Sequence, residues 1–230
     1  MKKIEGMTER DLLAIKGKEL DKEEIFLWFN VSRAGWVHDG DIKKPHAELF
    51  GLCSNGYFDC QRILCYPNLS QILAQQLVQK LEDRNIRKIG WVVSSASINS
   101  IRFAFAVATI LKAVHIPIVE IETKDREALW RTIPSRAKVL QIEDMIITGL
   151  KVQKIRQLIN VKNQNEVEFL PLVGALVHRP KKLEEEPAKK VVGLIEREIW
   201  EVRSEECLLC AAGSKRCNPK TQWLELIGIG

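Results

Sequence analysis

At 230 residues the chain is long enough to bury one complete hydrophobic core, and its composition is 46% hydrophobic and 28% charged. This balance is typical of a folded globular protein and excludes extensive disorder. The net charge of +5 comes from basic residues scattered among acidic ones. It favours a solvated surface and anionic small molecules, so we expect no nucleic-acid partner.

The sequence also predicts where the protein acts. It has no apolar run approaching the ~20 residues that span a membrane. Its first residues, MKKIEGMTERDLL, lack the apolar stretch of a signal peptide. We therefore predict a cytoplasmic protein with no membrane partner. In that compartment the six cysteines are expected to be reduced thiols or metal ligands rather than disulfides.

The first quarter of the chain contains two predicted helices and a predicted strand pair. Apolar spacing indicates helices over 8–16, capped by Thr8, and over 22–36. Residues 47–58 are predicted to form two short strands around the turn signal Ser54-Asn55-Gly56.

From residue 69 onward, predicted helices and strands alternate. The helices cover 69–83, 101–113 and 149–159, and the strands cover 88–93, 116–121, 138–142, 167–177 and part of 191–202. Continuous valine, isoleucine and leucine runs predict an α/β fold in which helices cover both faces of a parallel sheet. Ligands bind such sheets at the carboxyl ends of the strands, an edge that would gather the segments 94–100, 122–135 and 143–150.

One of these segments carries a recognisable chemistry. The strand at 138–142 leads into the adjacent carboxylates Glu143 and Asp144, then into Thr148 and Gly149 and the following helix. Carboxylates can hold hydroxyls or a metal, and the N–H groups at a helix N-terminus suit a phosphate. The pattern therefore suits a phosphorylated sugar. The alternative is that a carboxylate only caps the next turn.

The stretch Glu143-Asp144-Met145-Ile146-Ile147-Thr148-Gly149 resembles the signature of the type I phosphoribosyltransferases, a strand and two acidic residues before a threonine- and glycine-rich phosphate loop. The flanks are similar to the orotate phosphoribosyltransferases, over roughly residues 25–212. His46-Ala47-Glu48-Leu49 through Tyr57-Phe58 resembles their hood, and Cys207-Leu208-Leu209-Cys210 resembles a C-terminal Cys-x-x-Cys of some members.

The resemblance implies a type I phosphoribosyltransferase fold, divided into a hood at 1–66, a core at 67–204 and a Cys-x-x-Cys segment at 205–230. It implies a homodimer that transfers phosphoribosyl from magnesium phosphoribosyl pyrophosphate to an orotate-like base, a glycosyltransferase step of pyrimidine nucleotide biosynthesis that releases pyrophosphate.

The resemblance also assigns roles to residues. Glu143 and Asp144 would hold the ribose. The 5′-phosphate would lie on a loop made of Ile147, Thr148, Gly149, Leu150 and Lys151. The pyrophosphate would lie on a loop made of Ser94, Ser95, Ala96 and Ser97. A mobile loop would neutralise the leaving group with Lys124, Arg126 and Arg131.

Two loops depart from the family pattern. Leu150 and Lys151 stand where a second glycine and a hydroxyl residue are usual, and the segment 94–100 contains no glycine. The serines there could bind an anion, or Ser100 or Asn99 could simply cap an ordinary helix. A second hypothesis follows: a member of the fold that binds a nucleotide or phosphate, or has a structural role, without turnover.

The cysteines raise a separate question. Cys207 and Cys210 have metal-ligand spacing and Cys217 could be a third zinc ligand, with a remote fourth such as Cys53, Cys60, Cys65 or a residue of a second subunit. The alternative is buried or free thiols. We expect His46, His115 and His178 to be structural rather than catalytic.

Overall fold

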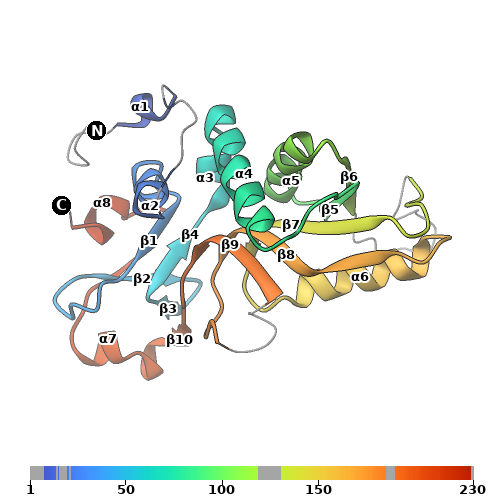
Figure 1. Ribbon diagram of the computed structural model, residues 1–230. Coiled ribbons are helices and arrows are strands. Elements are labelled where there is room, and N and C mark those ends of the chain that lie inside the picture. The colour runs from blue at the N-terminus through green and yellow to red at the C-terminus, as the bar shows by residue number, and fades with distance from the viewer. Residues whose placement is uncertain are drawn as a thin grey trace.

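The computed structural model describes residues 8–13, 15, 20, 22–118, 131–184 and 190–228 (Figure 1). Its centre is a five-stranded parallel sheet in the order β6-β5-β7-β8-β9. The strands are β5 (Trp91–Ser95), β6 (Val114–Ile118), β7 (Lys138–Ile146), β8 (Glu168–His178) and β9 (Val191–Glu196). The predicted parallel sheet, with the first three core strands as neighbours, is therefore confirmed.

The bounds of the core strands differ from the predicted ones in a way that affects the site. β7 was predicted to end at residue 142, but it continues to Ile146 because Met145 and Ile146 pair with β8. Glu143 and Asp144 thus lie inside a strand, and Glu143 is almost fully buried. β5 also extends further than predicted, to Ser95, which shortens the loop after it.

Helices cover both faces of this sheet. On one face, α4 (Pro67–Glu82) and α5 (Ile98–Leu111) bury the largest apolar cluster, against β7, β8 and β9. On the other, α6 (Leu150–Lys162) packs Ile155 and Ile159 against Val93 and Val139. Figure 1 shows α4 and α5 above the sheet and α6 below it.

The N-terminal region is built from short elements. Two helices come first, α1 (Glu9–Leu13) and α2 (Lys22–Val31). Four strands follow, β1 (Gly35–Val37), β2 (His46–Leu49), β3 (Leu52–Ser54) and β4 (Gly56–Phe58), and then helix α3 (Cys60–Leu64). The two strands predicted around residues 54–56 are present, because β3 ends at Ser54 and β4 begins at Gly56, but they do not pair with each other. β3 pairs with β2, to which it is joined at Phe50 and Gly51, both with positive φ, and β4 pairs with β1.

The C-terminal residues join this region. β10 (Glu201–Arg203) pairs with β3, and β11 (Arg216–Cys217) pairs with β2, which gives the sheet order β10-β3-β2-β11. The 3-10 turn η2 (Ser204–Glu206) and α7 (Leu208–Ala211) connect them, and α8 (Trp223–Leu226) follows. Residues on both sides of 205 therefore complete the sheet of the predicted hood.

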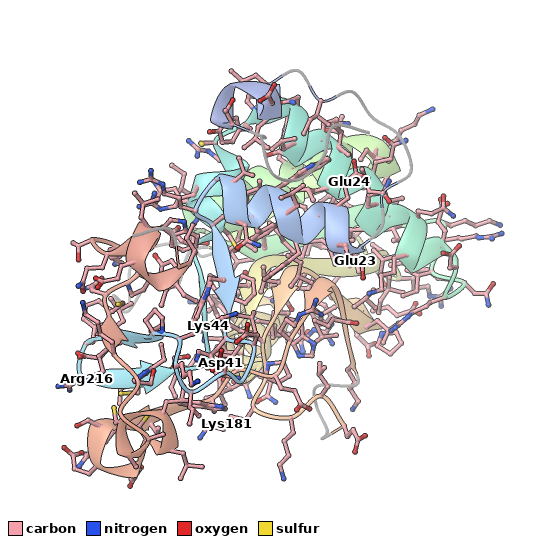
Figure 2. All side chains as sticks on the ribbon, turned by 90° about the vertical axis from the view of Figure 1, so that its left-hand side faces the viewer. Glu23, Glu24, Asp41, Lys44, Lys181 and Arg216 are labelled. Atoms are coloured by element: carbon pink, nitrogen blue, oxygen red, sulfur yellow. The ribbon has the colours of Figure 1, made fainter. Side chains whose placement is uncertain are left out.

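Charged side chains of both signs are interspersed on the surface. Figure 2 shows Glu23 and Glu24 on α2, Asp41 and Lys44 on the loop before β2, and Arg216 on β11. Among the described residues, no helix is long and apolar enough to cross a membrane.

Candidate functional site

Glu143 has the most complete set of polar contacts at the carboxyl edge of the sheet. Its Oε1 accepts from the Ser95 backbone N–H at 3.0 Å and from Gln141 Nε2 at 3.1 Å. Its Oε2 accepts from Ser95 Oγ at 2.7 Å and Ser100 Oγ at 2.8 Å. The side chain is 1% exposed. Three donors from Ser95 and Gln141, and a fourth from Ser100 that is shared with Asp144, thus compensate the burial of this carboxylate and connect the end of β5 and the start of α5 to β7.

Asp144 is more accessible. Ser100 Oγ lies 2.6 Å from its Oδ1 and also accepts from its backbone N–H at 3.3 Å. A serine hydroxyl carries one proton, so Ser100 donates to only one of the two carboxylates at a time. Below the pair, the Cys60 thiol of α3 donates to the Asp144 carbonyl at 3.5 Å. Asp144 keeps acceptor capacity for an external hydroxyl or a cation.

A half-buried arginine completes the network behind Glu143. Arg156 of α6 donates from Nε to Gln141 Oε1 at 3.2 Å and from Nη2 to the Leu170 carbonyl at 3.0 Å. Its guanidinium also lies 5.0 Å from the Phe169 ring centroid, and burial lowers its pKa. The neutral side chain of Gln141 therefore links a half-buried cation to a buried carboxylate through two charge-assisted hydrogen bonds.

The predicted pyrophosphate loop is only two residues long. Ser95 ends β5, and Ser97 caps α5 by accepting from the Ser100 backbone N–H at 3.2 Å. The predicted caps Ser100 and Asn99 are wrong, because α5 begins at Ile98 and both lie within its first turn. Ser94 lies within strand β5, outside this loop, and its Oγ is hydrogen-bonded to His115 Nε2 of β6 at 3.0 Å.

The predicted phosphate loop lies between β7 and α6. Gly149 caps α6 with φ at 75°, a left-handed conformation that glycine adopts without strain. The N-cap glycine has no side chain to cap this N-terminus, and among the described residues the Thr148 hydroxyl accepts a long hydrogen bond from the Leu150 N–H at 3.4 Å. Ile147 and Leu150 expose their side chains, 41% and 61%, and Lys151 is exposed as well. The loop therefore offers N–H groups and a hydroxyl between two apolar side chains.

A cavity of about 430 Å³ opens beside this loop, between α6 and the β8–β9 half of the sheet. Its floor is apolar, with Val152, Val173 and Val191, and basic residues stand on its rim: Lys181, Lys182 and Lys190. His178, 1% exposed, borders it with Nδ1 lacking a hydrogen-bond partner among the described residues. Burial lowers the pKa of this histidine.

The predicted mobile loop does not reach the site in the described part. Lys124 and Arg126 lie outside the described residues. Arg131 stacks over Trp91, 5.5 Å from the ring centroid, at the beginning of β5 and thus at the edge of the sheet opposite the carboxylates. A role for Arg131 in neutralising pyrophosphate does not fit this position.

The hood carries a smaller cavity of about 210 Å³. It is lined by residues of β2, β3 and β4, such as Leu49 and Tyr57, and by Arg179 and Glu201. Arg179 follows β8 and pairs with Glu201 at 2.9 Å, while its Nε lies 3.1 Å from Met145 Sδ. The contact with Met145 places this cavity next to the strand that carries Asp144.

The cysteines separate into two groups. Cys207 and Cys210 lie with Cys53 and His46, and the four candidate ligand atoms are within 4.8 Å of one another. Cys217 is fully buried elsewhere, in a cluster with Trp223 and Tyr57, and does not join them. His46 was expected to be structural, and no spacing signal in the sequence connects it to residues more than 150 positions away.

Sequence reasoning also missed Ser100, Gln141 and Arg156 as parts of the site. Gln141 carried a usable signal, because it is a polar residue within an otherwise apolar predicted strand. Arg156 resembled any solvated helix residue. Ser100 was named only as a cap.

Comparisons with known proteins agree with this geometry. No family model matches the sequence. The orotate phosphoribosyltransferase of Thermoanaerobacter sp. (strain X514) is 30% identical over 204 residues, which cover 87% of this chain and 97% of that protein. A phosphoribosyltransferase structure from Corynebacterium diphtheriae aligns with a TM-score of 0.53 over 77% of this chain and 96% of that one, at 14% identity.

A second solved structure, Leishmania donovani UMP synthase, aligns with a TM-score of 0.52 over 74% of this chain but 35% of its own, also at 14% identity. At such identities the two structures show the fold alone. The sequence relative is closer and is covered almost from end to end. The chain therefore belongs to the type I phosphoribosyltransferase family, among the relatives of orotate phosphoribosyltransferase.

Proposed function

We propose that this chain binds magnesium phosphoribosyl pyrophosphate at the carboxyl edge of the sheet and transfers phosphoribosyl to an orotate-like nucleobase, releasing pyrophosphate. The observation that carries the proposal is the succession of an accessible carboxylate, a hydroxyl and an uncapped helix N-terminus along one strand–turn–helix unit: Asp144, Thr148 and α6. The relative from Thermoanaerobacter supports the choice of base class.

Each group has a role in this proposal. Asp144 would accept from the ribose hydroxyls or hold Mg²⁺, which prefers carboxylate oxygens. The first N–H groups of α6 and the Thr148 hydroxyl would bind the 5′-phosphate at the positive end of the helix dipole. The base would occupy the hood cavity, near Arg179. Such a site acts by positioning and charge neutralisation, without a covalent nucleophile.

A second candidate function is binding without turnover. The saturation of Glu143 favours it, because a ribose hydroxyl could reach this carboxylate only by displacing Ser95, Ser100 or Gln141. The exposed apolar side chains of Ile147 and Leu150 stand where phosphate oxygens would approach, which argues against a phosphate site built for turnover. In this candidate Glu143 is a structural anchor of the loop after β5.

One pair of measurements separates the candidates. Calorimetric titration with magnesium phosphoribosyl pyrophosphate reports binding, and pyrophosphate release in the presence of orotate reports transfer. Saturable binding with orotate-dependent release supports transfer. Binding without pyrophosphate release in the presence of any nucleobase supports the second candidate. If phosphoribosyl pyrophosphate does not bind at all, the transfer proposal is wrong, and the second candidate is reduced to binding of another nucleotide or phosphate, or to a structural role.

The matched variants are Asp144→Asn and Glu166→Gln. Asp144→Asn should abolish the binding signal, while Glu166→Gln removes an exposed carboxylate distant from the site and should leave it unchanged. Equal losses in both variants would show that the binding is a nonspecific charge effect.

A further inference from the structure

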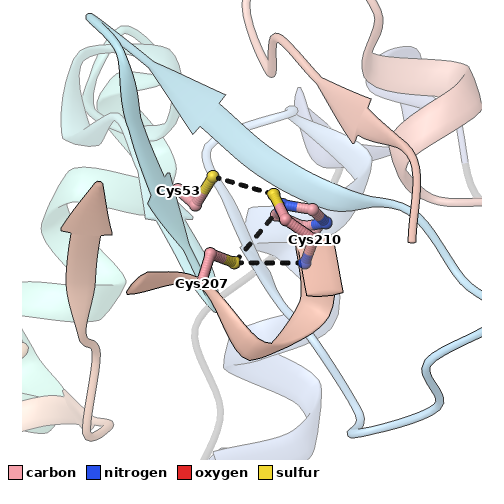
Figure 3. A group of neighbouring side chains, drawn as sticks. Cys53, Cys207 and Cys210 are labelled. Carbon is pink, nitrogen blue, oxygen red and sulfur yellow. Dashed lines mark hydrogen bonds between the residues drawn. The ribbon is translucent and has the colours of Figure 1, made fainter. Parts of the chain in front are cut away.

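Four side chains from distant parts of the chain meet at one point in the hood. His46 lies on β2, Cys53 on β3, and Cys207 and Cys210 flank and enter α7. Three of the four are buried and Cys210 is half-buried. Figure 3 shows the thiols of Cys53, Cys207 and Cys210 turned toward one another.

The spacing of their donor atoms fits a tetrahedral metal ion. Cys53 Sγ lies 3.5 Å from Cys210 Sγ, and His46 Nε2 lies 3.4 Å from Cys210 Sγ and 3.7 Å from Cys207 Sγ. Zinc bonds of about 2.3 Å to sulfur and about 2.0 Å to nitrogen place neighbouring ligand atoms roughly 3.5–3.8 Å apart in a tetrahedron. The side chains therefore need little movement to bind an ion.

The hydrogen bonds around the cluster also prepare it for a metal. Ser214 Oγ donates its proton to the Lys44 carbonyl at 2.7 Å, so toward His46 Nδ1, 2.8 Å away, it acts as an acceptor. Nδ1 therefore carries the proton, and the lone pair of Nε2 points at the thiols. The backbone N–H of Cys210 donates to Cys207 Sγ at 3.4 Å, a bond that stabilises a thiolate.

We propose that His46, Cys53, Cys207 and Cys210 bind one structural Zn²⁺ ion. Three thiolates and one imidazole are the ligand types that zinc selects, and four protein ligands leave no open position for water or substrate. Binding the ion displaces the thiol protons to solvent. This ligand set replaces the one predicted from the sequence, because Cys217 lies in another cluster.

The ion would hold the hood together. β10 and β11 border the β2–β3 hairpin, and the ligands come from both the hairpin and the segment between β10 and β11. The apolar cluster here is small: among the described residues it has three buried members, Cys53, Cys207 and Leu209, with a few partly buried side chains packed against them. Ala47 and Ser54, the neighbours of two ligands, line the hood cavity, so the zinc would also fix the walls of that cavity.

The test begins with elemental analysis of the full chain, purified without chelators. We expect about one zinc per chain, and after exchange one Co²⁺ with the visible absorption of tetrahedral thiolate cobalt. Cys53→Ser and Cys207→Ser should each lose the metal. The matched controls are Cys217→Ser, a buried thiol of the same C-terminal segment, and Cys65→Ser, an exposed one, and both should keep it.

Ser214→Ala supplies a graded variant. Losing the acceptor that orients His46 should lower zinc affinity about 10–100-fold, measured by competition with a chromophoric chelator. If the cysteine variants do not fold, wild-type protein answers the question alone: a chelator should lower its melting temperature and added Zn²⁺ should restore it. Wild-type protein that takes up neither zinc nor cobalt, and melts identically with and without chelator, would overturn the proposal.

Discussion

Glu143 and Asp144 are neighbours in the sequence, but their surroundings give them different roles. Glu143 is buried and accepts four hydrogen bonds from three residues. Asp144 is partly exposed, and Ser100 alone bonds its carboxylate in the described part of the chain. The family signature predicts a pair of equivalent ligands. The contacts instead indicate one structural carboxylate and one free to meet a ligand.

This division predicts opposite behaviour for two conservative variants. Glu143→Gln replaces a carboxylate oxygen by an N–H₂ group that cannot accept from Ser95 or Ser100. It should lower the free energy of unfolding by about 2 kcal/mol, the scale of a charged buried hydrogen bond. Asp144→Asn should leave apo stability equal or slightly higher, because a like-charge repulsion is relieved, and should remove the ligand-induced rise in melting temperature.

Thermal melts of both variants, with and without magnesium phosphoribosyl pyrophosphate, measure the change in stability and the ligand-induced rise in melting temperature. If Asp144→Asn instead destabilises the apo protein by about 1 kcal/mol while the wild type ignores the ligand, Asp144 has only a structural role, through its hydrogen bond with Ser100.

His115 predicts a pH dependence of stability. Burial lowers its pKa from 6.5 to about 4, so the folded chain keeps it neutral where the unfolded chain protonates it. Between pH 6.5 and about 4 the unfolded state binds the extra proton, and stability falls as pH falls; above 6.5 the contribution is constant. Because the ring is partly exposed, the loss should be about 2 kcal/mol rather than the full shift.

Denaturant unfolding at several pH values, for wild type and His115→Gln, measures this contribution. Glutamine does not titrate, so the variant should lose less stability than wild type over the same pH range. Parallel curves would show that His115 is not responsible.

The sequence predicted the elements that depend on the local pattern of apolar residues. It did not predict the features that depend on pairing between residues distant in the chain. Apolar runs predicted β5, β6 and β7 as neighbouring parallel strands, because burial on both faces leaves a local signature. The extension of β7 through Asp144 depends on pairing with β8, and no property of residues 143–146 alone shows it. The same holds for His46 and Cys210, which meet across 164 positions.

The phosphate loop and the N-terminus of α6 also give a testable prediction. Leu150 is the first residue of α6, and its 61% exposed side chain stands beside the N–H groups that would bind phosphate. Leu150→Gly should restore close backbone approach and lower the Kd for magnesium phosphoribosyl pyrophosphate about tenfold. Glycine in a helix costs about 0.5–1 kcal/mol of stability, which the folded protein should tolerate.

Leu150→Ala is the control, because it removes the long side chain but keeps Cβ and helix propensity. Calorimetric titration of the three proteins compares their affinities. An unchanged Kd in Leu150→Gly would mean that the phosphate lies elsewhere, for example among the lysines of the neighbouring cavity.

The structure shows which surfaces of the whole molecule are available for a homodimer. The segment 53–65 is apolar and would suit a dimer interface if its side chains were exposed. Its apolar side chains are instead buried within the chain: Cys53, Tyr57, Phe58, Cys60, Ile63 and Leu64. A homodimer needs another apolar surface. α5 offers one, because Ile98 and Phe105 are 57% and 64% exposed and lie two turns apart on one helix face.

We predict a homodimer that buries this face of α5. Exposed aromatic and aliphatic side chains on one surface favour association, and a charge placed there opposes it because burying an unpaired charge is costly. Light scattering of the wild type should give about twice the chain mass of 26.3 kDa at micromolar concentration. Phe105→Glu should give the monomer mass, whereas Val161→Glu, a still more exposed apolar position on α6, should remain dimeric. A monomeric wild type would contradict the dimer itself, and a dimeric Phe105→Glu would place the interface on a different face.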